Sequence, residues 1–571
     1  MYLETSVNVP YESTGITKKT IRGVTYVYYT YARKYDPDKK YTKPLNTTIG
    51  KCLKDNTDLM YPNTNYLRFF PEAKLPEEKD ESLRSGCLRI GTFLVIRKVI
   101  AEYQLDAILR PIIGKDTGLF LDLAAYSIIT ENNAGQYYPD YGFNHPLFTR
   151  GMRIYSDSKV SGFLGSITRD QSIEFQCAWN EERDHRERIY ISYDSTNKSC
   201  SAGDIDLVEV GHSKKHSTGP VVNYAVAYDT ENAVPLFYED YPGSIVDVSQ
   251  LQAMLRKAQG YGYRHIGFVL DRGYFSESNI HYMDKCGYEF IIMMKGMKDL
   301  VRDLVLKVKG TFEEDRKYSI RKYKVCGTTI KRRMFPSDKK DRYFHIYYNE
   351  RKRSSEHELF ESRIDDMLHA LSKYEGKPFT AKGSFSKYFD LTFANAGTPD
   401  ERFLGAREKY DVINAQIQLC GYFVIITSEK MDAARALDLY KGRDASEKLF
   451  RGDKSYLGNK SFRVDSTESM HAKIFIEFVA MIIRNRIHTR LRDQIIKAGK
   501  KANYMNVPAA IRELEKIEII RSSDRNYYLD HAVTATQKAI LAAFNMDASN
   551  VKVQAAGINE DLTIRRQEVK Q

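Results

Sequence analysis

Two aspartates stand at the ends of two apolar stretches of this sequence. Asp194 follows residues 188–193, and Asp271 follows residues 265–270. Each stretch has the apolar and aromatic composition of a buried strand, and α/β proteins place their sites at the sheet edge where such strands end. A single aspartate at a strand end is usually a turn or cap residue. The pair therefore predicts chemistry only if a third acid joins it.

Glu447 is the candidate for that third acid. It lies in a pattern with Tyr440, Arg443 and Lys454. On a helix that turns about 100° per residue, the cations and the carboxylate would lie within roughly 60° of the tyrosine. One helix face would then present a ring, two cations and an acid. The alternative is a solvated helix face with ordinary ion pairs, and Gly452 could end the helix before the last cation.

Three converging carboxylates predict metal chemistry on a phosphodiester. The acids repel each other unless cations lie between them, and Mg²⁺ prefers oxygen ligands while keeping positions open for phosphate oxygens. Two such ions can activate water or a 3′-hydroxyl and stabilise the leaving oxygen. Nearby Arg and Lys would hold the nucleic-acid backbone. This chemistry needs no covalent nucleophile from the protein.

Alternating strands and helices must position these acids. After the strand at 188–193, the patterns predict strands at 221–228 and 234–238, a helix at 249–258, the strand at 265–270, a helix at 276–285, and strands at 288–293 and 421–427. Strands that lead into helices indicate an α/β sheet with some parallel pairing. A long helix is expected to begin after Ser428.

At 571 residues the chain is too long for one ordinary domain. Changes in composition and hydrophobic pattern divide it into six parts. A small β-containing unit at 1–85 precedes a helical region at 86–185. The α/β core follows in two parts, at 186–296 and 406–500, separated by a mostly β insertion at 297–405, and a C-terminal helical unit with a tail occupies 501–571. The first unit could contact DNA, but a tyrosine-rich hairpin without such a role explains its composition equally well.

Composition excludes several classes of protein. Lys and Arg number 87 against 75 Asp and Glu, and this excess favours a polyanionic partner. None of the seven cysteines forms a C-x-x-C pair, which argues against a disulfide framework, argues against a zinc ribbon and favours a reducing cytoplasm. The N-terminus has no signal-peptide pattern, and the most apolar stretches are too short to span a bilayer. We expect a soluble protein.

Four ordered motifs resemble one family, the cut-and-paste DDE insertion-sequence transposases with a Y-x2-R-x3-E-x6-K signature (the IS-four-like group). Tyr440, Arg443, Glu447 and Lys454 match that signature in type and spacing. Residues 193–196 resemble the motif of the first acid, and 271–275, with Arg272 after the acid, resemble the motif of the second. Residues 211–214 and 235–243 also look familial, with Pro-Gly where many members have Gly-Asn.

The resemblance implies a fold and a reaction. It implies a ribonuclease-H-like catalytic core with a β insertion, two Mg²⁺ or Mn²⁺ ions on Asp194, Asp271 and Glu447, and a backbone grip on transposon-end DNA by Tyr440, Arg443 and Lys454, to which we add Arg272 as a candidate. It further implies a homodimer that pairs two ends of double-stranded DNA, in the prokaryotic cytoplasm at the nucleoid. The family reaction nicks the element's ends, releases it, and joins the 3′-hydroxyls to target DNA.

The sequence departs from that family in one respect and leaves rivals open. Characterised relatives carry an aromatic in the insertion, often Trp, that stacks on a flipped base, whereas the single Trp here is Trp179, upstream of the core. One rival is a ribonuclease-H-like nuclease that cuts without joining strands. Another is a catalytically silent relative retained for DNA binding. Two sets of basic residues could either contact DNA or lie on a solvated face. They are residues 316–333 and the three arginines Arg484, Arg486 and Arg490.

Overall fold

The computed structural model describes most of the chain. The described residues are 2–3, 5–38, 40–75, 84–183, 188–200, 205, 207–210, 219–245, 247–263, 265–294, 298–338, 340–380, 382–444, 448–449, 452, 456–457, 461–464, 466–499, 502–522 and 526–568. The chain divides into two compact units, one formed by Met1–Leu88 with Glu518–Asp530, the other by Arg89–Ile517 with His531–Gln571.

The first unit contains a five-stranded antiparallel sheet in the order β1-β5-β4-β3-β2. Its elements are β1 (Val7–Asn8), β2 (Ile16–Ile21), β3 (Val24–Asp36), β4 (Tyr41–Cys52), β5 (Leu59–Pro62) and α1 (Thr64–Phe69). One face of the sheet buries Val27, Ile49 and Met60 with Tyr66 of α1. A smaller sheet in the order β21-β20-β6 joins β6 (Cys87–Arg89), β20 (Glu518–Arg521) and β21 (Tyr527–Leu529).

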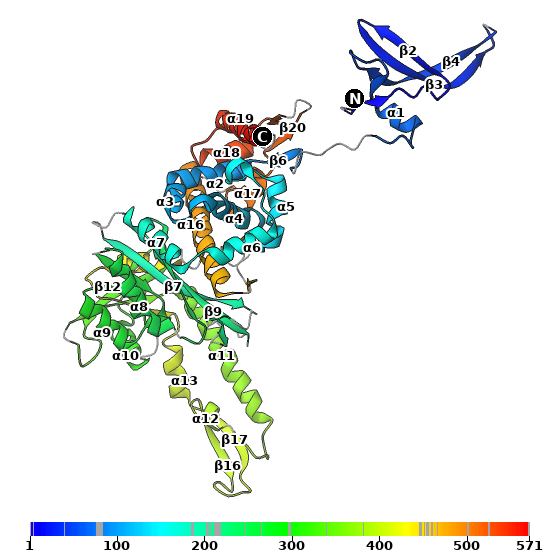
Figure 1. Cartoon of the computed structure of the whole chain (residues 1–571). Coiled ribbons are helices and arrows are strands. Elements are labelled where there is room, and N and C mark those ends of the chain that lie inside the picture. The colour runs from blue at the N-terminus through cyan, green and yellow to red at the C-terminus, as the bar shows by residue number, and fades with distance from the viewer. Residues whose placement is uncertain are drawn as a thin grey trace. The chain divides into compact units, whose positions relative to one another are not determined.

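The second unit opens and closes with helices (Figure 1). They are α2 (Gly91–Glu102), α3 (Leu105–Ile113), α4 (Thr117–Thr130), α5 (Tyr138–Asn144), α6 (Asp157–Ser166) and α7 (Arg169–Glu181), and later α16 (Thr467–Ala498), α17 (Val507–Leu514), α18 (Ala535–Ala542) and α19 (Ala548–Glu568). The long α16 packs against α2, α4, α6 and α7 and against the central sheet at β10. Its run of buried residues from Ile474 to Ile483 explains why a 32-residue helix can be so apolar.

The central sheet has eleven strands and mixed pairing. Its path is β10-β9-β7-β11-β12-β18-β15-β14-β13, with β19 beside β7 and β8 beside β9. The strands are β7 (Ile189–Cys200), β8 (Glu209–Val210), β9 (Pro220–Asp229), β10 (Val234–Pro242), β11 (Ile266–Leu270), β12 (Glu289–Met293), β13 (Ser319–Ile320), β14 (Val325–Arg332), β15 (Arg342–Tyr348), β18 (Tyr422–Thr427) and β19 (Ser461–Phe462). The expected parallel pairing is present, because β11 runs parallel to both β7 and β12.

Helices cover both faces of this sheet. On one face α14 (Ala433–Gly442) buries Leu437 against Val269 of β11 and Ile291 of β12. On the other lie α8 (Asp247–Gly260) and α9 (Glu277–Cys286), and there Phe268 contacts the ring of Tyr288, whose hydroxyl donates to the carbonyl of Leu255 in α8. The result is a mixed α/β fold built around a large sheet.

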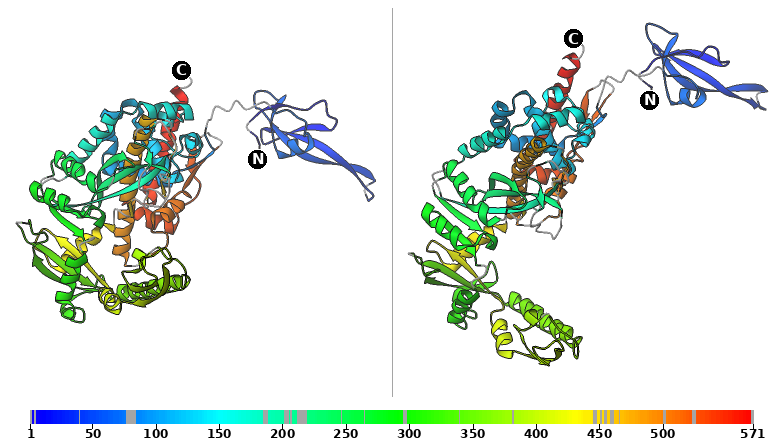
Figure 2. Two further views of the ribbon diagram at one scale, coloured as in Figure 1. Left: turned by 90° about the horizontal axis from the view of Figure 1, so that it is seen from below. Right: turned by 60° about the horizontal axis from the view of Figure 1, so that its bottom comes forward.

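Residues 298–421 differ from the separate, mostly β insertion expected from the sequence. After α10 (Lys298–Val308), strands β14 and β15 pair onto β18 and so extend the central sheet. A distinct lobe follows, made of α11 (Glu350–Ser372), α12 (Lys382–Phe385), β16 (Phe389–Ala394), β17 (Arg402–Glu408) and α13 (Tyr410–Ile417). Its own core includes Ile364, Phe389 and Phe403. Figure 2 shows the lobe, in yellow-green, projecting from the sheet.

Two elements at the expected site also have different limits. The strand expected to end on Asp194 continues to Cys200, because β9 pairs with it along that whole length. The helix expected after Ser428 begins at Ala433, where the Asp432 carboxylate accepts a hydrogen bond from the Arg435 amide, and it ends at Gly442. The signature from Tyr440 to Lys454 therefore does not lie on one uninterrupted helix.

A carboxylate pair at the other end of these strands predicts pH-dependent stability. The Arg188 guanidinium lies 2.6 Å from Glu289 and 2.6 Å from Glu429, while burial and the neighbouring Glu429 raise the pKa of Glu289 to about 7. The folded protein thus binds a proton more tightly than the unfolded chain, so stability is highest below the ordinary carboxyl pKa and falls as the pH rises to about 7.

Glu289→Gln should remove that pH dependence. Because the Glu289 side chain is 29% exposed, we expect solvent to limit the effect to about 1 kcal/mol. Thermal unfolding of wild type and variant at acidic and at mildly basic pH measures it. Wild type should lose more stability than Glu289→Gln between the two conditions, and equal losses would contradict the assignment.

Within the described residues, no helix combines the length and the apolar character needed to cross a bilayer.

Candidate functional site

The two aspartates predicted from the sequence lie side by side. In the parallel pair β7–β11, Tyr193 is opposite Leu270, so the next residues, Asp194 and Asp271, are neighbours on adjacent strands. Neighbouring strands are about 4.8 Å apart. The apolar runs that form the two strands thereby fix the spacing of the two acids.

Both acids belong to the face covered by α14. Tyr190 and Val269 pack there with Leu437, and side chains on one face of a strand recur every two residues. Asp194 is four residues after Tyr190, and Asp271 is two after Val269. Asp271 keeps an extended backbone, with φ −70° and ψ 156°, so the alternation holds up to it.

The opposite face holds the acids in place. Tyr193 is fully buried and its ring lies 5.5 Å from that of Tyr274, which belongs to the short 3-10 turn of residues 272–274 after the second acid. Asp194 is half-buried, and one of its carboxylate oxygens accepts a hydrogen bond of 2.9 Å from the amide of Ser195. Two carboxylates are thus presented on a rigid edge, with tyrosines packed behind them.

Arg443 of the signature reaches this edge. Its guanidinium lies 3.8 Å from the carboxylate of Asp271 and 5.7 Å from the centre of the Tyr440 ring, and its side chain is 13% exposed. Tyr440 itself is 5% exposed and belongs to the core beneath α14. The tyrosine therefore supports the arginine from the core and offers little surface to a ligand, whereas Arg272 on the turn is exposed.

Glu447 and Lys454 lie outside the described residues. Their described neighbours show where the chain runs between α14 and α16. Gly452 lies against the Arg484 guanidinium, because a Cβ at Gly452 would lie 2.6 Å from one of its nitrogens. The same guanidinium lies 4.8 Å from the centre of the Tyr456 ring. Beyond them β19 pairs in parallel with the end of β7. The segment thus passes from α14 to the strand that carries Asp194.

Positive charge gathers along this segment. Burial lowers the pKa of His488, and the charges of Arg492, Arg484 and Lys448 lower it further. Such clustering of cations suits a polyanionic ligand. Arg484 therefore lies beside the segment between α14 and α16, and its contact with DNA stays a prediction.

Four of the other basic candidates have structural partners. Arg486 and Arg490 both pair with Glu102 of α2, the second at 2.7 Å, and so tie α16 to the helical region. In the basic stretch 316–333, Lys322 pairs with Asp438 of α14, and Lys331 lies 3.4 Å from Asp341. These contacts explain the four cations without a nucleic-acid ligand.

Sequence reasoning missed two asparagines that hold the turn after β10. The side-chain amide of Asn223 donates to the carbonyls of Pro242 (2.9 Å) and Ile245 (3.0 Å), and its own oxygen accepts from Asn197 of β7. A Cβ at Gly243 would lie 2.3 Å from the carbonyl oxygen of Val221. The unusual Pro-Gly pair was the available signal, since it marks a turn that requires glycine and that Asn223 holds at the end of β10.

The oxygen donors present fit a hard divalent cation. Asp194 and Asp271 supply carboxylate oxygens on one face, and Mg²⁺ binds in proteins through one or two carboxylates with waters and substrate phosphates. Among the described residues no group of three or more His, Cys, Asp or Glu side chains is close enough to hold an ion. A complete set of protein ligands would thus need a residue outside that part of the chain.

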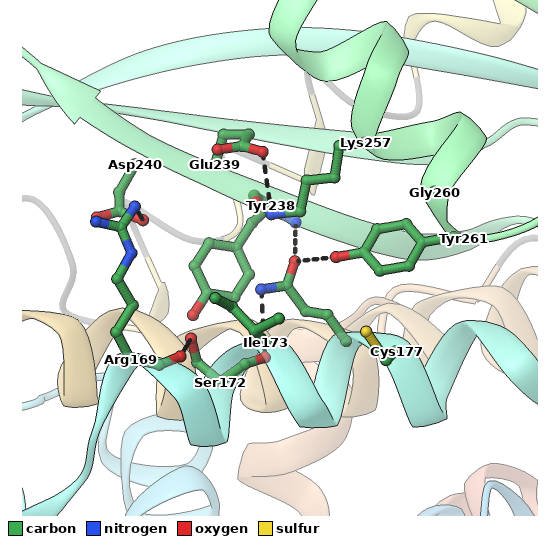
Figure 3. Close-up of a pocket in the computed structure, with 11 residues that line it drawn as sticks. Arg169, Ser172, Ile173, Cys177, Tyr238, Glu239, Asp240, Lys257, Gly260 and Tyr261 are labelled. Carbon is green, nitrogen blue, oxygen red and sulfur yellow. Dashed lines mark hydrogen bonds and ion pairs between the residues drawn. The ribbon is translucent and has the colours of Figure 1, made fainter.

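A pocket of about 400 Å³ between α7, α8 and β10 is a separate feature (Figure 3). The Lys257 ammonium lies 3.0 Å from the carboxylate of Glu239 and donates to the carbonyl of Tyr238, while the Gln176 side-chain oxygen accepts from the Tyr238 amide. Burial alone would raise the pKa of Asp240, but the hydrogen bond and charge of His471 lower it below its ordinary value. These contacts join the two helices to the sheet, and the pocket contains neither candidate acid.

Trp179 is also structural. It is fully buried, and its indole nitrogen donates to the carbonyl of Pro235 at 2.9 Å. The Arg183 guanidinium lies 4.1 Å from the centre of its ring. The single tryptophan is therefore fixed between α7 and the start of β10.

Comparison with known proteins identifies the family. Residues 196–483, half of the chain, match the transposase DDE domain. The chain belongs to this family. It is a DNA transposase, and transposases of this class use divalent metal ions. The match begins within β7, two residues after Asp194, and includes Asp271, the α14 segment and the first half of α16.

Other comparisons add little to that assignment. A solved piggyBac transposase, in a synaptic complex with hairpin DNA, is similar over 75% of this chain and 77% of its own, with 9% identity and a TM-score of 0.33. A likeness this loose carries no argument about the transposase described here. No curated protein matches the chain in sequence.

Proposed function

We propose that this transposase cuts and joins DNA at one site formed by Asp194, Asp271 and Glu447. In this proposal it belongs to the group with the Y-x2-R-x3-E-x6-K signature, and strands β10-β9-β7-β11-β12 are its ribonuclease-H-like core. One observation carries the proposal: the parallel register of β7 and β11 places two acids side by side on the face covered by α14. The segment that continues from that helix contains Glu447.

Each candidate residue has a role that depends on its position. Asp194 and Asp271, with Glu447, would hold two Mg²⁺ or Mn²⁺ ions, which when bound polarise a phosphodiester and lower the pKa of an attacking water or hydroxyl. Arg443 neutralises Asp271 in the protein alone. With DNA bound, it would contact a backbone phosphate, as would Lys454 and Arg272. Tyr440 positions Arg443 by packing beneath its guanidinium.

The proposed reaction breaks and makes phosphodiester bonds without a covalent intermediate on the protein. Hydrolysis at each terminal inverted repeat of the element frees a 3′-hydroxyl. That hydroxyl then attacks a phosphodiester of target DNA, so one P–O bond forms as another breaks. Because two ends must be joined together, we further propose that a homodimer holds both ends.

Labelled DNA that carries the element's own ends tests this function. In Mg²⁺ the full-length protein should release the flanking DNA and then join the labelled 3′ end to a target plasmid, and chelation with EDTA should stop both steps. Cleavage without joining would favour a nuclease that cuts only. Specific end binding without cleavage would favour a silent DNA-binding relative, and absence of end binding would reject the proposal.

A further inference from the structure

The hairpin of β3 and β4 extends beyond the other strands of its sheet. β2 pairs with β3 as far as Tyr29, and β5 pairs with β4 only over residues 50–52. Beyond the pair of Tyr29 with Thr47, β3 and β4 pair only with each other and reach the pair of Asp36 with Tyr41. We call residues 30–46 the ribbon; it is the two-stranded end of the blue sheet in Figure 2.

The ribbon lacks the usual means of stability. An isolated two-stranded hairpin is marginal in water, because it needs a third strand or a helix to bury one face. Residues 31–35 and 41–44 are all exposed, so neither face of the ribbon is buried. Helix α1 packs mainly on the other part of the sheet, where Asn65 bonds to Thr47 and Tyr66 joins the core. It touches only the base of the ribbon, where the rings of Tyr31 and Phe69 stack with centroids 5.3 Å apart.

Like charges face each other on the ribbon. Lys34 is directly opposite Lys43 across the two strands, an arrangement that destabilises a hairpin unless an anion lies between the side chains. Arg33 and Lys40 add positive charge, and both are exposed. The pairing of the two lysines therefore does not stabilise the ribbon alone, whereas a polyanion bound between them would be attracted by both.

Exposed tyrosines accompany the cations. Tyr31, Tyr35 and Tyr41 are 46%, 58% and 47% exposed. Lysines and Pro44 could serve only to protect a free strand edge from aggregation. Tyr31 stacks on Phe69 of α1. Large aromatic side chains have the opposite tendency, so edge protection does not explain Tyr35 and Tyr41. Cations interleaved with exposed rings instead suit a ligand that offers both phosphates and stacked bases.

We propose that the ribbon enters a groove of duplex DNA. The major groove of B-form DNA admits a two-stranded β-ribbon, and β-ribbon readers bind DNA in this way. Lys34, Lys43 and Arg33 would contact phosphates along the groove walls, and the tyrosines would lie against sugars and base edges. The inference rests on the proposed function only in taking DNA as the partner, because the ribbon belongs to a different unit from the acids.

Duplex binding by the full-length protein tests the ribbon without any cleavage. The probe is a labelled random-sequence duplex, followed by fluorescence anisotropy across a salt series in EDTA. Lys34→Ala/Lys43→Ala should reduce the slope of log affinity against log salt by about 2, because each lost phosphate contact removes about one unit. Affinity should fall roughly ten- to hundredfold near physiological salt.

Two further variants sharpen the result. Tyr35→Ser/Tyr41→Ser keeps the charge, so it should weaken binding without changing the salt slope. Lys54→Ala, an exposed lysine past the opposite end of β4, is the matched control and should bind as wild type does. The lysine double variant should melt no lower than wild type, because it removes a like-charge pair.

The opposite results are equally clear. A slope in Lys34→Ala/Lys43→Ala equal to that of Lys54→Ala would overturn the ribbon proposal. If wild type binds no random-sequence duplex, the ribbon proposal fails, whereas the proposed function fails only if the element's own ends are not bound either. Normal duplex binding that the ribbon variants leave unchanged would overturn the ribbon alone.

Discussion

Asp271→Asn should reduce DNA cleavage at least about 1000-fold, which corresponds to roughly 4 kcal/mol of activation free energy. The substitution keeps the size of the side chain but removes the charge that a divalent ion needs. DNA binding should persist, because backbone contacts by cations carry most of the affinity. Asp194→Asn and Glu447→Gln should behave alike if the three acids serve one site. Gel assays of end cleavage and of end binding, run on the same preparations, measure both properties.

A matched control separates this effect from a general loss of charge. Asp303 lies on α10 with its side chain 56% exposed, and Asp303→Asn should cut DNA as wild type does. Normal cleavage by Glu447→Gln, with loss in the two aspartate variants, would keep the register argument and reject Glu447 as the third ligand. Normal cleavage by Asp271→Asn would reject the site itself.

Lys198→Met should destabilise the second unit by about 3–5 kcal/mol, the usual loss when one partner of a buried ion pair is removed. Lys198 is four residues beyond Asp194 on β7 and forms an ion pair with Glu477 of α16. The two side chains are 0% and 2% exposed. The Lys198 ammonium also lies 4.5 Å from the ring centre of Tyr224. Without the lysine, the Glu477 carboxylate would remain charged in the core.

The double variant makes this prediction specific. Lys198→Met/Glu477→Leu removes both charges and should recover most of the stability, since apolar replacement of a buried pair is often neutral. Lys257→Met, which breaks a half-buried pair with Glu239, should cost no more than about 1 kcal/mol. Thermal and denaturant unfolding of the full-length protein measure all three. Equal losses in Lys198→Met and in the double variant would show that packing, and not the buried charge, causes the effect.

The elements closest to the acids could be predicted from the sequence because their signals are local. The strand β11 is a continuous apolar run, and the acid at its end is visible without any knowledge of the partner strand. Some parallel pairing was expected from the strand–helix alternation, although the sequence did not show which strands would pair. Only the register, however, shows that Asp194 and Asp271 share a face.

Other features of the fold could not be predicted because they depend on contacts between residues far apart in the chain. Residues 195–200 are polar and resemble a loop, yet they continue β7 because β9 pairs with them and Glu477 neutralises Lys198. From the sequence, Arg486 and Arg490 could equally contact DNA or lie on a solvated face. In the fold they pair with Glu102, more than 380 residues earlier in the chain. The strands β14 and β15 were expected, but their pairing with β18 depends on a strand some 75 residues further on.

The lobe of residues 350–417 is attached at a single point of the sheet. The last residue of β15, Tyr348, is directly paired with the first residue of β18, Tyr422, so the chain leaves and re-enters at neighbouring positions. The strands already hold these two ends together, and the entropy of closing a loop grows only slowly with its length. The lobe also has its own core. In evolutionary terms this junction is an insertion site, at which the lobe can be lengthened, exchanged or lost while the geometry of the acids stays the same.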